Sequence, residues 1–284
     1  MRSLSAHDLF TEADRRGQRA VPCIDVAGGN ADIIEAICTR LATAGVCAFL
    51  SSTPASIDAY LGLEHFRESI ELARRRHGVY AAPHLDHAED PYDVERALET
   101  GIRSVMFDGS LLAFSQNVAR TRSIVARAHA MGASVEAELG AIGGKEDPGE
   151  PTVARNVDPG EAVRFLERAT PDLFAPAIGT VHGRRGAEAH IDWELVDRLV
   201  ADLGGVPLVL HGTTGLPDDH VRRLVALGFR KVNYATVIRD AFVSGVAEAL
   251  SGDGAAPRPQ ELLAGGRQAV AAAVDRILEV VAMR

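Results

Sequence analysis

The sequence is poor in aromatic residues, in cysteine and in positive charge. Aromatic side chains make up 5% of its 284 residues and apolar residues 46%, so its core must be mainly aliphatic. The net charge of −9 argues against a general nucleic-acid binder, because phosphate contacts need clustered Lys and Arg. It does not exclude a small anionic substrate, since a pocket can be locally positive or present backbone N–H groups.

The three cysteines also limit the class of protein. Cys23, Cys38 and Cys47 form neither a CxxC pair nor a disulfide framework, which fits a reducing compartment. The N-terminus lacks the apolar core of a signal peptide, and no stretch approaches the roughly 18 apolar residues of a membrane span. We therefore expect a cytoplasmic globular protein with neither a nucleic-acid nor a membrane partner.

Short aliphatic runs alternate along the chain with longer segments of helical spacing. Eight runs are candidate strands: Ala20–Val26, Val46–Leu50, Val79–His84, Ser104–Phe107, Ser134–Glu138, Leu173–Ala177, Pro207–Leu210 and Lys231–Asn233. Segments with helical spacing between them include Leu63–Arg76, Pro91–Thr100, Asn117–Met131, Gly160–Arg168, Trp193–Leu203 and Asp218–Leu227. Eight successive β–α units favour a parallel sheet, and eight is the number that closes a barrel.

The predicted fold is therefore α/β: one (β/α)₈ TIM barrel that forms a single domain over residues 1–284. Extra C-terminal helices at Ala235–Leu250 and Pro259–Met283 would pack outside the barrel. The alternative, an open doubly wound sheet, is disfavoured because no GxGxxG motif follows the first candidate strand. In a barrel, the functional residues lie on the loops after the carboxyl ends of the strands.

The third candidate strand leads into a run of ionisable residues. Asp90, directly before Pro91, is explained as the N-cap of a helix. This leaves Asp86 and His87 without a structural explanation. His84 competes with His87 as a functional histidine, because His84 shares a strand face with Asp86 whereas His87 lies in the loop.

Two more histidines occupy equivalent places, His182 after the sixth candidate strand and His211 after the seventh. A single histidine is more often structural than a metal ligand. Three imidazoles at one rim, with an open position for substrate, are a common catalytic zinc shell.

Three loops add further signals. The sequence HGTTG at 211–215 and NYAT at 233–236 follow the last two strands, where barrels often bind phosphate. Ordinary strand-to-helix turns capped by Thr would also account for them. The long loop that follows Glu138 carries paired glycines and acids, so it is either a mobile polar loop or a lid that brings Glu146 onto a substrate.

Taken together, these segments resemble the class II aldolases, especially the fructose- and tagatose-bisphosphate group. The resemblance runs from about Ala20 to Val246 and is densest in six segments: His84 to His87, Ser104 to Ser110, Glu136 to Asp147, Ala177 to Gly183, His211 to Gly212 and Lys231 to Thr236.

The resemblance implies roles for individual residues. The zinc ligands would be His87, His182 and His211, which selects His87 over His84. Asp86 would exchange a proton with the C4 hydroxyl of the substrate, and Glu146 with the carbanion carbon. Asp108 and Glu138 would line the metal pocket. Contacts with the substrate and its phosphate would come from Ser51, Gly183, Gly212, Thr214, Asn233 and Thr236.

The implied activity is zinc-dependent, reversible cleavage of a ketose bisphosphate of the fructose or tagatose 1,6-bisphosphate type. The products would be dihydroxyacetone phosphate and an aldehyde such as glyceraldehyde 3-phosphate. The resemblance further implies Na⁺ or K⁺ as a second cofactor, a homodimer or homotetramer, and a role in carbohydrate metabolism such as glycolysis.

Four positions depart from the family pattern: Asp25, Thr213, Arg184 and Val237. Asp25 stands where the family usually has Asn near the distal phosphate, which a carboxylate would repel. These departures support an alternative, a class II aldolase specialised on a monophosphorylated or other non-standard ketose in a biosynthetic pathway. A barrel hydrolase is disfavoured because no HxH pair follows the first strand. A barrel that only binds a sugar phosphate would be expected to lack a metal ligand or Asp86.

Overall fold

The structure, a computed structural model, describes residues 3–144, 153–183, 189–251 and 257–282. Eight parallel strands close into a barrel in the order β1-β10-β9-β7-β5-β4-β3-β2. Their bounds are β1 (Val21–Asp25), β2 (Ala48–Ser52), β3 (Ala81–Ala88), β4 (Ser104–Phe107), β5 (Ser134–Leu139), β7 (Leu173–Pro176), β9 (Leu208–Leu210) and β10 (Phe229–Tyr234). The predicted TIM barrel is confirmed, and the eight predicted strands are its eight strands. A further parallel pair, β6 (Gly143–Gly144) and β8 (Val181–His182), was not predicted.

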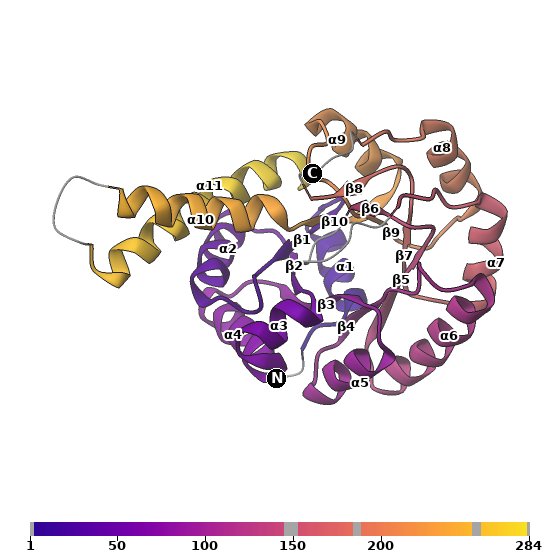
Figure 1. The fold of residues 1–284 in the computed structure, drawn as a ribbon, viewed down its shortest axis with the longest axis horizontal. Coiled ribbons are helices and arrows are strands. Elements are labelled where there is room, and N and C mark those ends of the chain that lie inside the picture. Colours follow the sequence, from indigo (N-terminus) through magenta and orange to yellow (C-terminus); the bar gives the residue numbers. More distant parts are fainter. Residues whose placement is uncertain (1–2, 145–152, 184–188, 252–256, 283–284) are drawn as a thin grey trace.

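Helices surround the barrel (Figure 1). They are α1 (Ala6–Arg15), α2 (Ala31–Ala44), α3 (Pro54–Tyr60), α4 (Gly62–His77), α5 (Pro91–Thr100), α6 (Phe114–Ala130), α7 (Pro159–Ala169), α8 (Trp193–Asp202), α9 (Asp218–Leu227), α10 (Thr236–Leu250) and α11 (Pro259–Val281). The predicted cap of α5 is confirmed, since Asp90 accepts a hydrogen bond from the backbone N–H of Tyr92 at 2.9 Å. None of the described helices has the length and apolar character required to cross a membrane.

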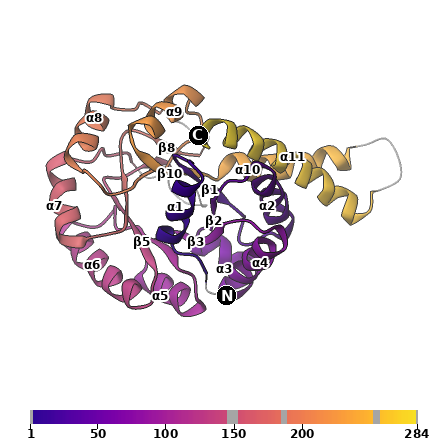
Figure 2. The same cartoon turned by 180° about the vertical axis from the view of Figure 1, so that it is seen from behind.

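Two apolar clusters form the core. The larger one fills the layer between the strands and the surrounding helices. The smaller one contains Leu9 and Ala13 of α1, packed with buried strand residues such as Phe49 and Val209. Helix α1 lies across one end of the barrel (Figure 2). Because α1 precedes β1 and packs on residues near the strand starts, it closes the amino end and leaves the carboxyl end for the site.

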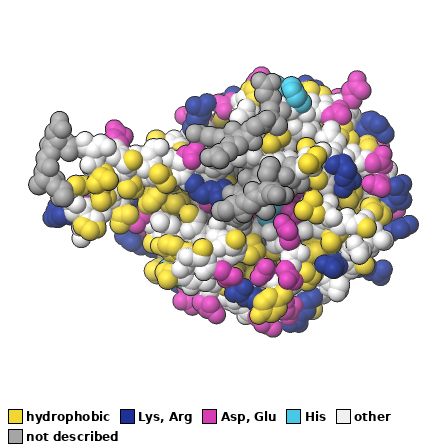
Figure 3. All heavy atoms as spheres, viewed as in Figure 1, with side chains coloured by type: hydrophobic (Ala, Val, Ile, Leu, Met, Phe, Trp, Pro, Cys, Tyr) yellow, Lys and Arg dark blue, Asp and Glu magenta, His cyan; other side chains and the backbone are white. Residues whose placement is uncertain are grey.

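Helices α10 and α11 form a hairpin that extends away from the barrel (Figure 1). They approach closely at Gly245, where an added Cβ would lie 2.4 Å from the carbonyl oxygen of Gly265. Apolar side chains gather along this arm (Figure 3), and Val243 and Leu250 are among the exposed large ones. The predicted C-terminal helices are thus present and pack outside the strands.

Candidate active site

Three imidazole rings meet at the carboxyl end of the barrel. The ring centroid of His87 lies 4.9 Å from that of His182 and 4.6 Å from that of His211, and the latter two are 5.7 Å apart. One nitrogen from each ring lies within 4.8 Å of the other two. Burial lowers the pKa of His211, so that this ring is neutral and can offer a lone pair. The donor set fits a divalent metal of the zinc type with an open position.

An irregularity in β3 brings His87 into this group. In a regular strand, successive side chains point to opposite faces, so Asp86 and His87 would not both reach the same site. The register between β3 and β4 shifts between Leu85 and Ala88, and His87 has a φ of +48°. A left-handed conformation costs a non-glycine residue about 1–3 kcal/mol, and strained residues of this kind cluster at functional sites. The bulge therefore lets two adjacent residues contribute to one site.

Two carboxylates orient two of the rings. Asp108 Oδ2 lies 2.9 Å from His87 Nδ1, and Glu136 Oε1 lies 2.7 Å from His211 Nε2. The nitrogen left for a metal is therefore Nε2 in His87 and Nδ1 in His211. Burial raises the pKa of Asp108, but hydrogen bonds and the charge of His87 outweigh it and hold the pKa at about 2. Such carboxylate–imidazole pairs fix the ring that binds a metal and make it a better ligand.

His182 is held by the short strand pair outside the barrel. Gly144 of β6 pairs with His182 of β8, and its φ is +81°. A Cβ at Gly144 would lie 2.1 Å from the carbonyl oxygen of His182, so only glycine fits. The paired glycines, predicted to lie in a long loop, thus include a residue that supports a histidine of the candidate metal site.

Asp86 is buried beside the three rings. Asn233 donates a hydrogen bond from Nδ2 to Asp86 Oδ2 at 3.0 Å, and the same nitrogen lies 3.3 Å from His211 Nδ1. Burial raises the pKa of Asp86, but Lys231, His87 and neighbouring groups hold it well below its ordinary value. Asp86 is therefore a carboxylate at neutral pH and can accept a proton.

His84 belongs to a different group of potential ligands, which it forms with Asp86 and Glu136. It is fully buried, its Nδ1 is 2.8 Å from Ser104 Oγ, and its Nε2 is 3.5 Å from Asp86 Oδ1. It is not part of the three-imidazole group. The choice of His87 over His84, which the residue pattern alone left open, agrees with this arrangement.

A second group of potential ligands adjoins the first. His87, Asp108 and Glu138 each offer an atom within 4.8 Å of the others. Burial and the charge of Asp108 raise the pKa of Glu138 well above its ordinary value. Glu138 Oε2 is buried and has no hydrogen-bond partner among the described residues. A nearby cation would therefore stabilise the ionised form of the Glu138 carboxyl group.

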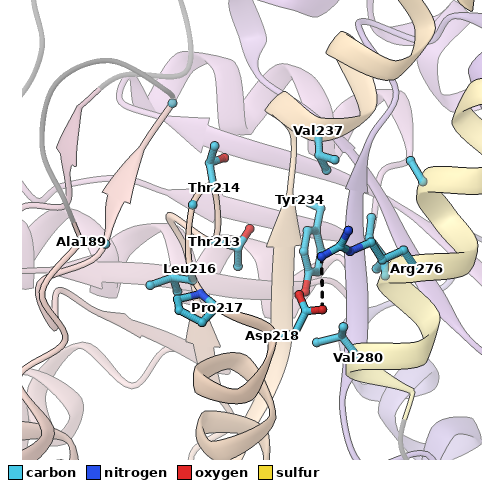
Figure 4. Close-up of a pocket in the computed structure, with 14 residues that line it drawn as sticks. Ala189, Thr213, Thr214, Leu216, Pro217, Asp218, Tyr234, Val237, Arg276 and Val280 are labelled. Carbon is cyan, nitrogen blue, oxygen red and sulfur yellow. Dashed lines mark hydrogen bonds and ion pairs between the residues drawn. The ribbon is translucent and has the colours of Figure 1, made fainter.

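The loops after β9 and β10 lie against each other. Thr213 donates from Oγ1 to the carbonyl oxygen of Asn233 at 2.6 Å, so the side chain that departs from the family pattern links the loop after β9 to the carboxyl end of β10. A cavity of about 670 Å³ opens beside these loops and α11 (Figure 4). Gly183, Thr214 and Val237 line it, and Arg276 pairs across it with Asp218 at 3.4 Å. None of the three clustered histidines lines this cavity.

A family model settles what kind of protein this is. The model for class-II fructose-bisphosphate aldolases matches residues 5–284. The chain belongs to this family. It is a class II aldolase, an enzyme that cleaves a carbon–carbon bond, as the resemblance predicted.

Solved structures of aldolases have the same fold. The YdjI aldolase from Escherichia coli K12 is 25% identical with a TM-score of 0.82, and the match covers 96% of this chain and 95% of that one. A candidate fructose-1,6-bisphosphate aldolase from Coccidioides immitis is 28% identical with a TM-score of 0.86, covering 97% and 95%. Fructose-bisphosphate aldolase from Campylobacter jejuni, 19% identical with a TM-score of 0.80 over 98% and 95%, supports the fold alone.

Of the remaining predicted site residues, Ser51 and Thr236 lie near the carboxyl ends of β2 and β10. Ser51 is buried on β2, in register with His84 on β3. Thr236 begins α10, directly after the loop that follows β10. Glu146 and Arg184 lie outside the described residues.

Asp25 is tied to its own loop. Its Oδ1 accepts a hydrogen bond from the backbone N–H of Ala27 at 2.9 Å, and its Oδ2 accepts one from Ser52 Oγ at 3.1 Å. Ser52 Oγ in turn accepts the backbone N–H of Gly28 at 2.7 Å. The carboxylate that departs from the family pattern therefore also shapes the turn after β1.

Sequence reasoning missed two members of the site, Glu136 and Lys231. Both are buried in the barrel, with Lys231 Nζ 2.8 Å from Glu136 Oε2. Burial raises the pKa of Glu136, but Lys231 and His211 lower it to about 2. A signal was present, since Glu136 lies two residues before Glu138 and Lys231 two before Asn233. Residues two apart on a strand share a face.

Replacement of Gly212 by alanine tests how tightly the loop after β9 is fixed. Gly212 has a φ of +66°, and a Cβ there would lie 2.7 Å from the backbone nitrogen of Val181. We expect Gly212→Ala to lower the free energy of unfolding in urea by about 1–3 kcal/mol more than Gly78→Ala. Gly78 is the matched control, because its φ is +65° and a Cβ there meets nothing within 4 Å. Equal losses of unfolding free energy in the two variants would show that the loop after β9 can shift to accommodate the Cβ without a cost in stability.

Proposed function

We propose that this aldolase uses zinc to cleave a ketose bisphosphate of the fructose or tagatose 1,6-bisphosphate type, reversibly, to dihydroxyacetone phosphate and an aldehyde. The observation that carries the proposal is the cluster of His87, His182 and His211 beside the buried carboxylate of Asp86. Three imidazoles and no thiolate suit a catalytic zinc with one position left for substrate.

The chemistry of aldol cleavage fits the groups around this cluster. Breaking the C3–C4 bond requires removal of the C4 hydroxyl proton and leaves negative charge at C3. A proton must then be added to C3 to give dihydroxyacetone phosphate, the role that the resemblance gives to Glu146. Bound zinc would supply Lewis-acid polarisation of the adjacent C2 carbonyl. Asp86 accepts the hydroxyl proton, because its carboxylate is ionised at neutral pH. The Asn233 amide holds that carboxylate through the 3.0 Å hydrogen bond.

The loops after β9 and β10 supply the features of a phosphate site. Gly212 and Thr214 on the first loop and Thr236 at the start of α10 offer backbone N–H groups and hydroxyls. The N-terminus of α10 adds a favourable dipole for an anion. The Thr213–Asn233 hydrogen bond holds the loop after β9 against the carboxyl end of β10. We assign the phosphate of the three-carbon ketone to this region.

Asp25 favours a second candidate, an aldolase specialised on a monophosphorylated or other non-standard ketose. Its carboxylate is buried near the carboxyl end of β1, where family members for bisphosphates usually have Asn. A negative charge there disfavours a distal phosphate.

A substrate panel separates these candidates. The purified protein, loaded with zinc, is given fructose 1,6-bisphosphate, tagatose 1,6-bisphosphate and fructose 1-phosphate, and triose phosphate is measured by coupled NADH oxidation. We expect a bisphosphate to give a kcat/KM at least about tenfold above that of fructose 1-phosphate, equivalent to about 1.4 kcal/mol. The reverse preference would support the second candidate. No triose phosphate from any of the three, or equal rates after EDTA treatment, would contradict the proposal.

A further inference from the structure

A buried ammonium lies beneath the candidate metal site. Lys231, on β10, has an exposed side-chain fraction of 0%, as does its partner Glu136 on β5. Besides its 2.8 Å ion pair with Glu136 Oε2, Lys231 Nζ donates a hydrogen bond to Asn233 Oδ1 at 2.8 Å. Removing a charge from water is costly, and a buried ion pair is weak evidence for stability. The proton transfer described above does not involve this ammonium.

Two hydrogen-bonded paths lead from Lys231 to the reacting groups. Through Glu136, whose other oxygen lies 2.7 Å from His211 Nε2, the ammonium is connected to a candidate metal ligand. Through Asn233, which donates to Asp86 at 3.0 Å, it is connected to the candidate base. The Lys231 side chain is therefore connected to both His211 and Asp86, in each case through one intervening side chain.

The donors and acceptors along these paths fix the orientation of the Asn233 amide and the tautomer of His211. An ammonium only donates, so it must face Oδ1 of Asn233, which turns the Nδ2 donor toward Asp86. The ammonium likewise holds one oxygen of Glu136, and the other oxygen accepts the Nε2 hydrogen of His211. That tautomer leaves the Nδ1 lone pair for a metal.

The local charge distribution also favours a cation here. His84, Asp86 and Glu136 present atoms within 4.8 Å of one another, an arrangement that could itself hold a metal ion. Lys231 already supplies positive charge to this group, 2.8 Å from Glu136. It thus keeps two buried carboxylates together without a second metal ion.

We propose that Lys231 is a positioning residue: it fixes Glu136 and the Asn233 amide, and these orient His211 for zinc and Asp86 for the substrate. This inference rests on the proposed function, because it takes zinc as the metal and Asp86 as the base.

The test is a double-mutant cycle on zinc affinity, measured without substrate by competition with a chromophoric chelator. Lys231→Met and Glu136→Gln should each weaken zinc binding by about 10–100-fold, as loss of partners of metal ligands does. The double variant should bind zinc about as tightly as Glu136→Gln alone, because the effect of Lys231 on zinc passes through Glu136. At saturating zinc, Lys231→Met should also lower kcat by about tenfold through the loosened Asp86 carboxylate.

Arg74→Met is the matched control for loss of a buried ion pair. Arg74 pairs with Glu71 at 2.8 Å within α4, one of the helices that surround the barrel. It should lower Tm and leave zinc affinity unchanged. If Lys231→Met does not fold, the double variant, which carries two neutral side chains, supplies the comparison with Glu136→Gln.

Several results would overturn the inference. If Lys231→Met bound zinc with an affinity within twofold of the wild type, Lys231 would be a purely structural residue. If the double variant bound zinc more weakly than Glu136→Gln by the full factor lost in Lys231→Met, Lys231 would act independently of Glu136. Zinc binding without cleavage of any ketose would contradict the proposed substrate and leave the zinc-affinity cycle to decide on Lys231. Absence of zinc binding in the wild type would overturn both proposals.

Discussion

Replacement of His87 by alanine is expected to abolish stoichiometric zinc binding and to lower ketose-bisphosphate cleavage by about 10³-fold or more. The reason is the geometry of the cluster, in which three ring nitrogens lie within 4.8 Å of one another. With one of three protein ligands lost, the remaining two imidazoles cannot hold the metal at catalytic concentrations. Lewis-acid polarisation contributes several kcal/mol to such reactions, and each 1.4 kcal/mol is about a factor of ten in rate.

The measurement is zinc content by elemental analysis after gel filtration, together with the cleavage rate at saturating substrate. His129→Ala is the matched control, because it removes an imidazole that pairs with Asp172 on the outside of the barrel. It should retain one zinc per chain and wild-type turnover. If His87→Ala retained its zinc, His87 would not be a ligand, and the metal assignment would need another residue.

The barrel itself could be predicted because its signals are local. Strands buried on both faces appear in the sequence as continuous aliphatic runs, and each is followed by a helix with its own start and stop signals. Helix α5 is an example: Asp90 and Pro91 begin it and Gly101, in the left-handed conformation, ends it. The predicted bounds of α5 and α9 are those observed.

It was harder to predict which histidine of β3 reaches the site, because the answer depends on a bulge. The alternation rule for strands places His84 and Asp86 on one face and His87 on the other. The register shift between β3 and β4 overrides that rule at His87. A register shift arises from pairing with a strand elsewhere in the chain, so local sequence cannot specify it. Only the family resemblance selected His87.

The sequence carries a signal for Lys231 and for Glu136 separately, but their pairing could not be predicted from local sequence, for a related reason. Strands β5 and β10 are not neighbours in the sheet, since β7 and β9 lie between them. Their side chains therefore meet only across the barrel interior. A charged residue within an aliphatic run indicates a buried partner, but the closed barrel decides which partner it is.

Replacement of Asp86 by asparagine is expected to retain zinc and to lower kcat by about 10²–10⁴-fold, the range for loss of a general acid–base group. Asparagine has nearly the same shape, and its carbonyl oxygen can still accept the hydrogen bond from Asn233 Nδ2. The substitution therefore removes the negative charge and the basic lone pair while keeping the packing. The measurements are kcat at saturating zinc and substrate, and zinc content.

Asp158→Asn is the control for this substitution. Asp158 caps α7 by accepting the backbone N–H of Glu161 at 2.8 Å, a role that asparagine performs about equally well. Its kcat should match the wild type. The candidate base and a candidate zinc ligand are adjacent residues, Asp86 and His87, so a test must distinguish their functions. A fall in the kcat of Asp86→Asn with zinc still bound would show that Asp86 acts in proton transfer and not in metal binding. Unchanged turnover in Asp86→Asn would mean that the C4 proton leaves by another route, and the low pKa of this buried carboxylate would then reflect only its neighbours Lys231 and His87.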